Sequence, residues 1–262
     1  MTEWREGETA RFEDYLVKEE PLEIRIGTRP ITVTMRTPGH DLELAAGFLL
    51  TENVIAGSEQ IARLRQVATR GQTRNVVRVD LVRGHAMKPA QLQRMFVTTS
   101  SCGVCGKTSI DAVRVRGITR PNPHLRLSPD VLCLLPDALL SAQPLFGRTG
   151  GLHAAGLFDS AGTLIALRED VGRHNAVDKL IGWALAEKRL PLKESVLLVS
   201  GRGSFEIVQK ALVAGIPVVA CISAPSSLAV QLAWEFNQTL VGFLRGKRFV
   251  VYTGEDRVPM TW

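Results

Sequence analysis

Short apolar segments alternate with segments of helical pattern in the last third of the chain, and this alternation constrains the fold more than any other feature. Strands are expected where apolar residues form short runs, and helices where they recur every three to four positions. The expected order is strand Val196–Val199, helix Phe205–Ala214, strand Val218–Ile222, helix Leu228–Phe236 and strand Thr239–Leu244. This predicts an α/β fold with a mostly parallel sheet flanked by helices and a ligand site at the carboxyl ends of the strands.

Two of these strands are followed by loops of mostly small residues, here called the glycine–serine loops. The loop at 200–204 contains serine and glycine, and the loop at 223–227 contains three serines with alanine and proline. Such residues also occur at strand-to-helix junctions for steric and capping reasons alone. The repetition of the loop at neighbouring strand ends favours an anion site made by backbone N–H groups and the helix dipole. The candidate binding residues are Ser200, Gly201, Arg202, Gly203, Ser223 and Ser226.

The charge balance also indicates an anionic partner. The formal net charge is +6 and the isoelectric point is near 9.4. Only two tyrosines are present, which argues against a base-stacking nucleic-acid surface, so a phosphorylated small molecule fits better. Three cations, Arg245, Lys247 and Arg248, cluster around Gly246, where either a hairpin with solvated charges or a binding segment would give the same pattern.

Two thiols stand three positions apart at Cys102 and Cys105, after four hydroxylated residues and shortly before Lys107. Small neighbours leave both sulfurs approachable, and a nearby cation favours the nucleophilic thiolate. Cys102 and Cys105 are therefore the candidate catalytic residues.

Three alternatives use the same two cysteines. Half of a structural zinc site would need two further ligands, and histidines would have to supply them because no second C-x-x-C occurs. A thioredoxin-type dithiol would follow an apolar strand, which is missing here. A zinc deaminase would carry H-x-E together with P-C-x-x-C, but Ser101 stands in place of the proline and no H-x-E occurs.

The remaining cysteines, Cys133 and Cys221, lie in apolar runs and are predicted to be core residues. Four cysteines in 262 residues make no disulfide framework, the first residues lack the apolar run of a signal peptide, and no stretch is long enough to span a bilayer. A reducing cytoplasm is the expected compartment.

The first part of the chain is predicted to be rich in strands. Strands are expected at Leu22–Ile26, Ile31–Met35 and Val77–Leu81, with a helix at Leu42–Leu50. A basic stretch with two prolines around Asn122 marks the expected boundary. The predicted division is a smaller β-rich part, residues 1–120, ending in the C-x-x-C loop, and an α/β part, residues 121–262, that carries the binding loops.

The middle of the chain carries a helix start, a hairpin and a charged run. Ser128-Pro129-Asp130 is typical of a helix start, and Pro136 is expected to kink or restart that helix. A hairpin is expected from residues 149–158 to 164–167. The run Glu169–Lys179 would ordinarily be a solvated face, but its place between a strand and an apolar helix favours a functional role. His153 fits a core histidine and a site group equally well.

Five segments carry a resemblance to a known family. They are Ser100–Lys107, Thr149–Ala155, Glu169–Lys179, Ser200–Lys210 and Ile222–Val230. In this order they closely resemble the FdhD-type formate dehydrogenase accessory sulfurtransferases, and the match covers most of the chain. Asn53, where similar sequences often carry glycine, is a departure outside the expected site.

The resemblance implies a cytidine-deaminase-like core with a smaller domain, and a protein that takes sulfur from a cysteine desulfurase. It implies delivery of that sulfur to the molybdenum or tungsten bis(molybdopterin guanine dinucleotide) cofactor, which then enters formate dehydrogenase. Cys102 would be the principal persulfide carrier and Cys105 a secondary thiol. The cofactor, bound as substrate, would contact Phe243, Leu244, Arg245, Gly246, Lys247 and Arg248.

No structural metal is expected, because Cys102 and Cys105 must stay free to ionise, and no nucleic-acid partner is expected, because few aromatic residues lie near the cations. A homodimer is left open. Two other functions use the same residues. One is a nucleotide-binding module whose C-x-x-C binds structural zinc, and the other is a deaminase-like hydrolase with an unusual metal site.

Overall fold

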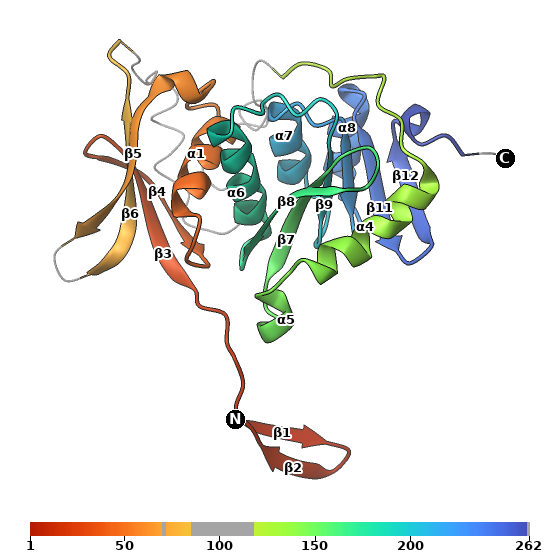
Figure 1. Ribbon diagram of the computed structural model, residues 1–262, viewed down its shortest axis with the longest axis horizontal. Coiled ribbons are helices and arrows are strands. Elements are labelled where there is room, and N and C mark those ends of the chain that lie inside the picture. The colour runs from red at the N-terminus through yellow and green to blue at the C-terminus, as the bar shows by residue number, and fades with distance from the viewer. Residues whose placement is uncertain (70–71, 85–117, 261–262) are drawn as a thin grey trace.

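The computed structural model describes residues 1–69, 72–84 and 118–260 (Figure 1). Its largest sheet has six strands in the order β12-β11-β10-β9-β7-β8. These are β7 (His153–Phe158), β8 (Leu164–Asp170), β9 (Val196–Val199), β10 (Val218–Cys221), β11 (Thr239–Arg245) and β12 (Arg248–Thr253). Strands β9, β10 and β11 are parallel and are connected through helices α7 (Phe205–Val213) and α8 (Ser227–Glu235), as the alternation predicts.

The expectation of a mostly parallel sheet is wrong, because the six-stranded sheet is mixed. Strand β7 is antiparallel to both β8 and β9, and β12 is antiparallel to β11. The β7–β8 and β11–β12 connections are too short to be crossovers, so each forces an antiparallel hairpin. The hairpin predicted around residues 149–167 is confirmed, while the cytidine-deaminase-like core stays a prediction.

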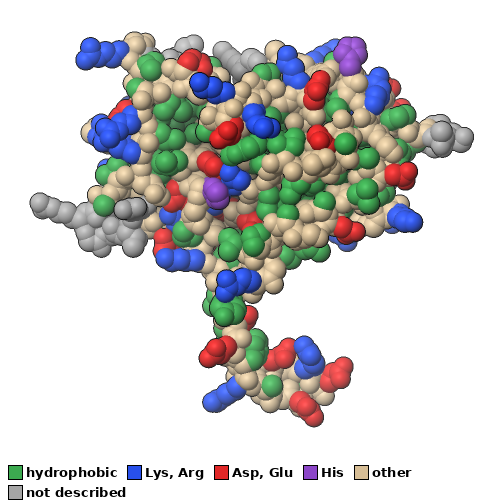
Figure 2. All heavy atoms as spheres, in the orientation of Figure 1, with side chains coloured by type: hydrophobic (Ala, Val, Ile, Leu, Met, Phe, Trp, Pro, Cys, Tyr) green, Lys and Arg blue, Asp and Glu red, His purple; other side chains and the backbone are tan. Residues whose placement is uncertain are grey.

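The N-terminal half forms a second sheet with strand order β4-β3-β6-β5. Its strands are β3 (Glu20–Ile26), β4 (Arg29–Arg36), β5 (Ile61–Thr69) and β6 (Gln72–Leu81), three of which were predicted with shorter bounds. The sequence did not predict β5, whose arginines weaken its alternation. A hairpin of β1 (Thr2–Arg5) and β2 (Glu8–Arg11) stands apart from the main body (Figures 1 and 2).

Helices α1 (Asp41–Thr51) and α6 (Arg173–Ala186) lie between the two larger sheets (Figure 1). Leu44 of α1, Leu180 of α6 and Leu197 of β9 share one buried cluster, while the next residue, Leu198, belongs to a second cluster on the other face of the sheet. The six-stranded sheet is therefore covered on both faces. The first cluster crosses residue 120, and the division into two domains stays a prediction.

Helix α4 (Pro129–Ser141) covers the second face. Ser128 Oγ accepts a hydrogen bond from Asp130 N–H at 3.2 Å, so the predicted start is confirmed. The helix continues through Pro136, so of the two expected effects the restart is wrong, and the kink stays a prediction. The remaining short helices are η1 (Ser58–Gln60), α5 (Phe146–Thr149) and η2 (Glu255–Arg257). None of the described helices is long and apolar enough to cross a membrane.

Two glycines allow α1 and α6 to approach closely. A Cβ on Gly47 would lie 1.9 Å from the Asp178 carbonyl oxygen, and one on Gly182 would lie 1.9 Å from the Glu43 carbonyl oxygen. Both obstacles are backbone atoms, which cannot rotate away. The distance between these helices therefore depends on the absence of a side chain at both positions.

We predict that Gly182→Ala lowers the free energy of unfolding by about 1–3 kcal/mol or more, because the added methyl group pushes the two helices apart. Urea denaturation followed by circular dichroism measures this change. Gly147→Ala is the control, since a Cβ there has no neighbour within 4 Å. A Gly182→Ala protein as stable as the parent would contradict the close approach.

Candidate functional site

The two glycine–serine loops lie side by side at the carboxyl ends of β9 and β10. Gly203 and Pro225 form an isolated β-bridge, and Ser226 N–H donates to the Gly203 carbonyl at 2.9 Å. A Cβ on Gly203 would lie 3.1 Å from Cys221 Sγ and 3.4 Å from Pro225 Cβ, which accounts for a glycine there. The structure brings both predicted loops into one polar edge of the sheet.

Some hydroxyl groups of these loops already accept hydrogen bonds from the protein backbone. Ser200 Oγ accepts from Ala154 N–H at 2.9 Å, and Ser226 Oγ caps α8 by accepting from Ala229 N–H at 3.3 Å. Arg202, in contrast, is exposed, and the side chain of the N-cap residue Ser204 makes no capping hydrogen bond at the start of α7. An anion at this edge would therefore be met by Arg202 and the α7 N-terminus rather than by the Ser200 hydroxyl.

The segment Phe243–Arg248 adjoins the second loop. Phe243 has a φ of 52°, in the left-handed region, and its N–H donates to the Ser223 carbonyl at 3.2 Å. It lies in an irregular part of the β11–β12 pairing, and the residue is 38% exposed. Leu244 is fully buried in the second hydrophobic cluster, so its side chain packs in the core and cannot contact a ligand at the surface.

Of the two alternatives left open at Gly246, the hairpin is present, formed by β11 and β12, and it places its cations at the same edge. Arg245, Lys247 and Arg248 are exposed. Arg245 Nε donates to the Ile222 carbonyl at 3.0 Å, which ties the hairpin to the end of β10. The hairpin and binding interpretations are therefore compatible, because the turn presents its charges beside the two loops.

A further polar group, here called the α6–α7 cluster, consists of His153, Arg173, His174, Ser204 and Glu206. It lies where α6 and α7 begin, and neither helix has a side-chain cap. His174 Nε2 lies 2.7 Å from Glu206 Oε2 and 3.2 Å from Ser204 Oγ. Both contacts use one ring nitrogen, whereas a nucleophile–histidine–acid triad uses two, so the geometry is not that of a hydrolytic triad.

The charges of the α6–α7 cluster follow from its surroundings. Burial, together with the nearby Arg173 and His174, lowers the pKa of His153, whose Nδ1 lies 3.4 Å from Ser200 Oγ. Burial alone would raise the pKa of Glu206, but the hydrogen bond and charge of His174, together with the charges of Lys210 and Arg173, lower it. Glu206 is therefore a carboxylate near neutral pH. The sequence did not single out Glu206, because its contact with His174 joins separate helices.

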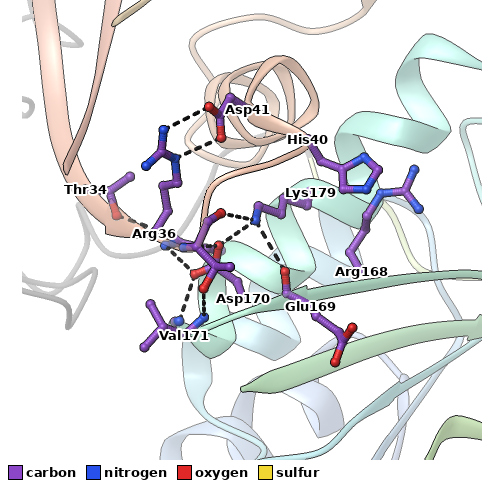
Figure 3. A network of polar contacts seen from close by, with 12 residues as sticks. Thr34, Arg36, His40, Asp41, Arg168, Glu169, Asp170, Val171 and Lys179 are labelled. Carbon is purple, nitrogen blue, oxygen red and sulfur yellow. Dashed lines mark hydrogen bonds and ion pairs between the residues drawn. The ribbon is translucent and has the colours of Figure 1, made fainter. Parts of the chain in front are cut away.

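The charged run Glu169–Lys179 is largely buried and forms a network that fixes the start of α6 (Figure 3). Lys179 Nζ lies 2.7 Å from Asp170 Oδ2 and donates to the Thr37 carbonyl at 2.8 Å. Thr37 N–H donates to Asp170 Oδ2 at 3.1 Å, and Val171 N–H donates to Thr37 Oγ1 at 3.1 Å. The network joins the end of β8 to the segment between β4 and α1, so the solvated-face interpretation is wrong.

The cysteines separate into two groups. Cys102 and Cys105 lie outside the described residues. Cys221 is buried as predicted, and its thiol donates to the Ser223 carbonyl at 3.0 Å. The expectation that Cys133 is a core residue is wrong: it is only partly buried, since α4 exposes one side of its apolar run. Within the described ranges, no three His, Cys, Asp or Glu side chains form a group that could hold a metal ion.

The fold and this edge define a mixed α/β protein whose basic and polar groups gather at the carboxyl ends of its parallel strands. Residues 17–259 match the model of the FdhD/NarQ family. The chain belongs to this family. The fold is similar to that of a putative formate dehydrogenase accessory protein from Desulfotalea psychrophila, with a TM-score of 0.77 and 26% identity over 99% of this chain and 97% of the other.

Curated relatives are similar over nearly their whole length. The sulfur carrier protein FdhD of Streptomyces avermitilis is 53% identical, over 98% of this chain and 93% of its own. The protein of that name from Mycobacterium tuberculosis is 53% identical, over 93% and 91%. The one from Sulfolobus acidocaldarius is 42% identical, over 98% and 96%.

We predict that Cys221 resists alkylation by iodoacetamide at pH 8, while Cys133 is modified slowly. Burial raises the pKa of Cys221 to about 11, so only about one thiol in a thousand is ionised at pH 8. Mass spectrometry of the alkylated peptides measures both sites, with urea-unfolded protein as the control. Rapid labelling of Cys221 in the folded protein would contradict its burial.

Proposed function

We propose that this protein is a sulfur carrier that serves the maturation of a formate dehydrogenase. The observation that carries the proposal is the convergence of three separate segments, the two glycine–serine loops and Phe243–Arg248, at one edge of the sheet. The names of the curated relatives and of the structural neighbour support the same role. The donor would be a cysteine desulfurase and the substrate the molybdenum or tungsten bis(molybdopterin guanine dinucleotide) cofactor.

The sulfur would travel as a cysteine persulfide. The Cys102 thiolate attacks the terminal sulfur of the donor's persulfide, forming a new S–S bond while the donor's S–S bond breaks. The donor cysteine leaves as a thiolate, so no external oxidant or reductant is needed. Cys105 would act as a secondary thiol, and the carrier would work in the cytoplasm without structural zinc, since a closed zinc site would occupy both thiolates.

The exposed edge would hold the phosphates of the cofactor's guanine nucleotide arms. Arg202, Arg245, Lys247 and Arg248 are exposed there, and the α7 N-terminus adds favourable backbone dipoles. Phe243 exposes an aromatic ring beside these cations, which suits contact with a base. Of the six residues expected in this segment, Leu244 contributes through its backbone and core packing.

We predict that Cys102→Ala abolishes sulfur loading. After incubation with a cysteine desulfurase and cysteine, the parent protein should contain a peptide one sulfur atom heavier at Cys102, as measured by mass spectrometry without reductant. Cys133→Ala is the matched control and should load normally, apart from a small loss of packing. Normal loading and normal formate dehydrogenase activation by Cys102→Ala would refute the assignment.

GDP should bind the edge, with affinity that falls as salt is added. We predict that Arg245→Ala/Arg248→Ala weakens GDP binding roughly tenfold or more in isothermal titration calorimetry, because charge-assisted contacts to phosphate are lost. Lys193→Ala is the control, since Lys193 is exposed just before β9 and thus at the opposite end of the sheet. Unchanged binding by the double variant would remove this site.

A further inference from the structure

Two buried polar atoms of the α6–α7 cluster have no hydrogen-bond partner in the part of the chain that the structure describes. They are Glu206 Oε1 and Arg173 Nε. The Glu206 side chain is only 9% exposed, and its other oxygen is held by His174. Leaving a buried polar atom unpaired is destabilising, and more so for a charged group. A pair of such atoms in one cluster therefore requires an explanation.

The α6–α7 cluster, which contains the two atoms, is partly exposed to solvent. His153, Arg173 and Ser204 are each only partly buried. A Cβ on Gly201 would lie 3.4 Å from the His153 ring and 3.6 Å from Arg173 Cδ, so the first glycine–serine loop touches the cluster directly. Arg173 immediately precedes His174, whose Nε2 lies 2.7 Å from Glu206 Oε2, so both side chains belong to the same junction of α6 and α7, and the charge of Arg173 helps to lower the pKa of Glu206.

The chemistry of the two atoms restricts what can satisfy both. The Glu206 carboxylate only accepts hydrogen bonds, and the Arg173 guanidinium only donates them. A phosphate would satisfy Arg173 but would be repelled by Glu206, and a metal ion would be repelled by Arg173. A neutral group with a donor and an acceptor next to each other can satisfy both atoms at once.

We propose that the α6–α7 cluster binds the hydrogen-bonding edge of a 2-amino-4-oxopyrimidine ring, with Glu206 Oε1 accepting from a ring or amino N–H and Arg173 Nε donating to the ring carbonyl. This proposal rests on the proposed function, because guanine and pterin rings share that edge and the expected cofactor contains both. The adenine edge has the opposite order, with an amino donor in place of the carbonyl acceptor.

The position of the cluster suits a ring whose phosphates lie farther along the same edge. His153 begins β7 and Phe243 lies in β11, with β9 and β10 between them. Three spacings between neighbouring strands amount to roughly 14 Å. The ring-binding cluster and the basic β11–β12 turn are thus separate places on one continuous edge.

The test compares GDP, ADP and neopterin, a simple pterin, by calorimetry. The parent protein should bind GDP at least roughly tenfold more tightly than ADP, and Glu206→Gln should lose roughly tenfold or more of its GDP affinity while ADP binding is unchanged. Glu194→Gln is the control, since Glu194 is exposed before β9. If Glu206→Gln weakens neopterin rather than GDP, the ring at this site is a pterin; if it weakens GDP, the ring is guanine.

The failure of this inference differs from the failure of the proposed function. GDP binding that depends on Arg245 and Arg248 but not on Glu206, with neopterin also unaffected by Glu206→Gln, would overturn the ring site and leave the phosphate site. Absence of GDP binding to the parent protein would instead remove the nucleotide part of the proposed function. If Glu206→Gln does not fold, equal affinities of the parent protein for GDP and ADP, with no binding of neopterin, would overturn the inference.

Discussion

The buried ion pair between Lys179 and Asp170 connects the two halves of this fold. Neither residue is more than 1% exposed, and both also bond to the backbone of Thr37. Removing one partner of such a pair leaves an uncompensated charge, at a cost of about 3–5 kcal/mol. Because Thr37 follows β4 while Asp170 ends β8 and Lys179 lies in α6, one small network aligns both sheets and the helix between them.

The same network fixes the geometry of the first turn of α6. Gly172 N–H and the Asn175 side chain donate to Asp170 Oδ1 at 2.8 and 3.1 Å. These two hydrogen bonds fix the first turn of α6 to the end of β8. Arg173 and His174 then project from a fixed turn toward α7 and the first glycine–serine loop. The close approach of α1 and α6 at Gly47 and Gly182 also fixes the position of α6. The α6 side of the α6–α7 cluster therefore takes its geometry from buried contacts, while the loops supply the rest of the polar edge.

The sequence predicted the parts of the fold that depend on local pattern. Strands β9 to β11 are apolar because both faces of the sheet are covered, and Ser128 caps α4 through residues two positions apart. Features that depend on contacts between residues far apart in the sequence were either not predicted or predicted wrongly. The charged run could not be recognised as buried, because its partner Thr37 lies 133 positions before Asp170. Cys133 and Cys221 both lie in apolar runs, but only the tertiary structure distinguishes a helix surface from a central strand.

Cys221 also illustrates how the fold keeps one sulfur inert beside the proposed binding edge. It ends β10 directly under the second loop, and its thiol donates to the carbonyls of Ser223 and Val241 at 3.0 and 3.2 Å. Those bonds stabilise the protonated form, and burial raises the pKa to about 11, so the nucleophilic thiolate is suppressed. A reactive thiol at that position would compete for any persulfide brought to the edge. The same burial that lets β10 complete the core therefore keeps Cys221 out of the proposed sulfur transfer.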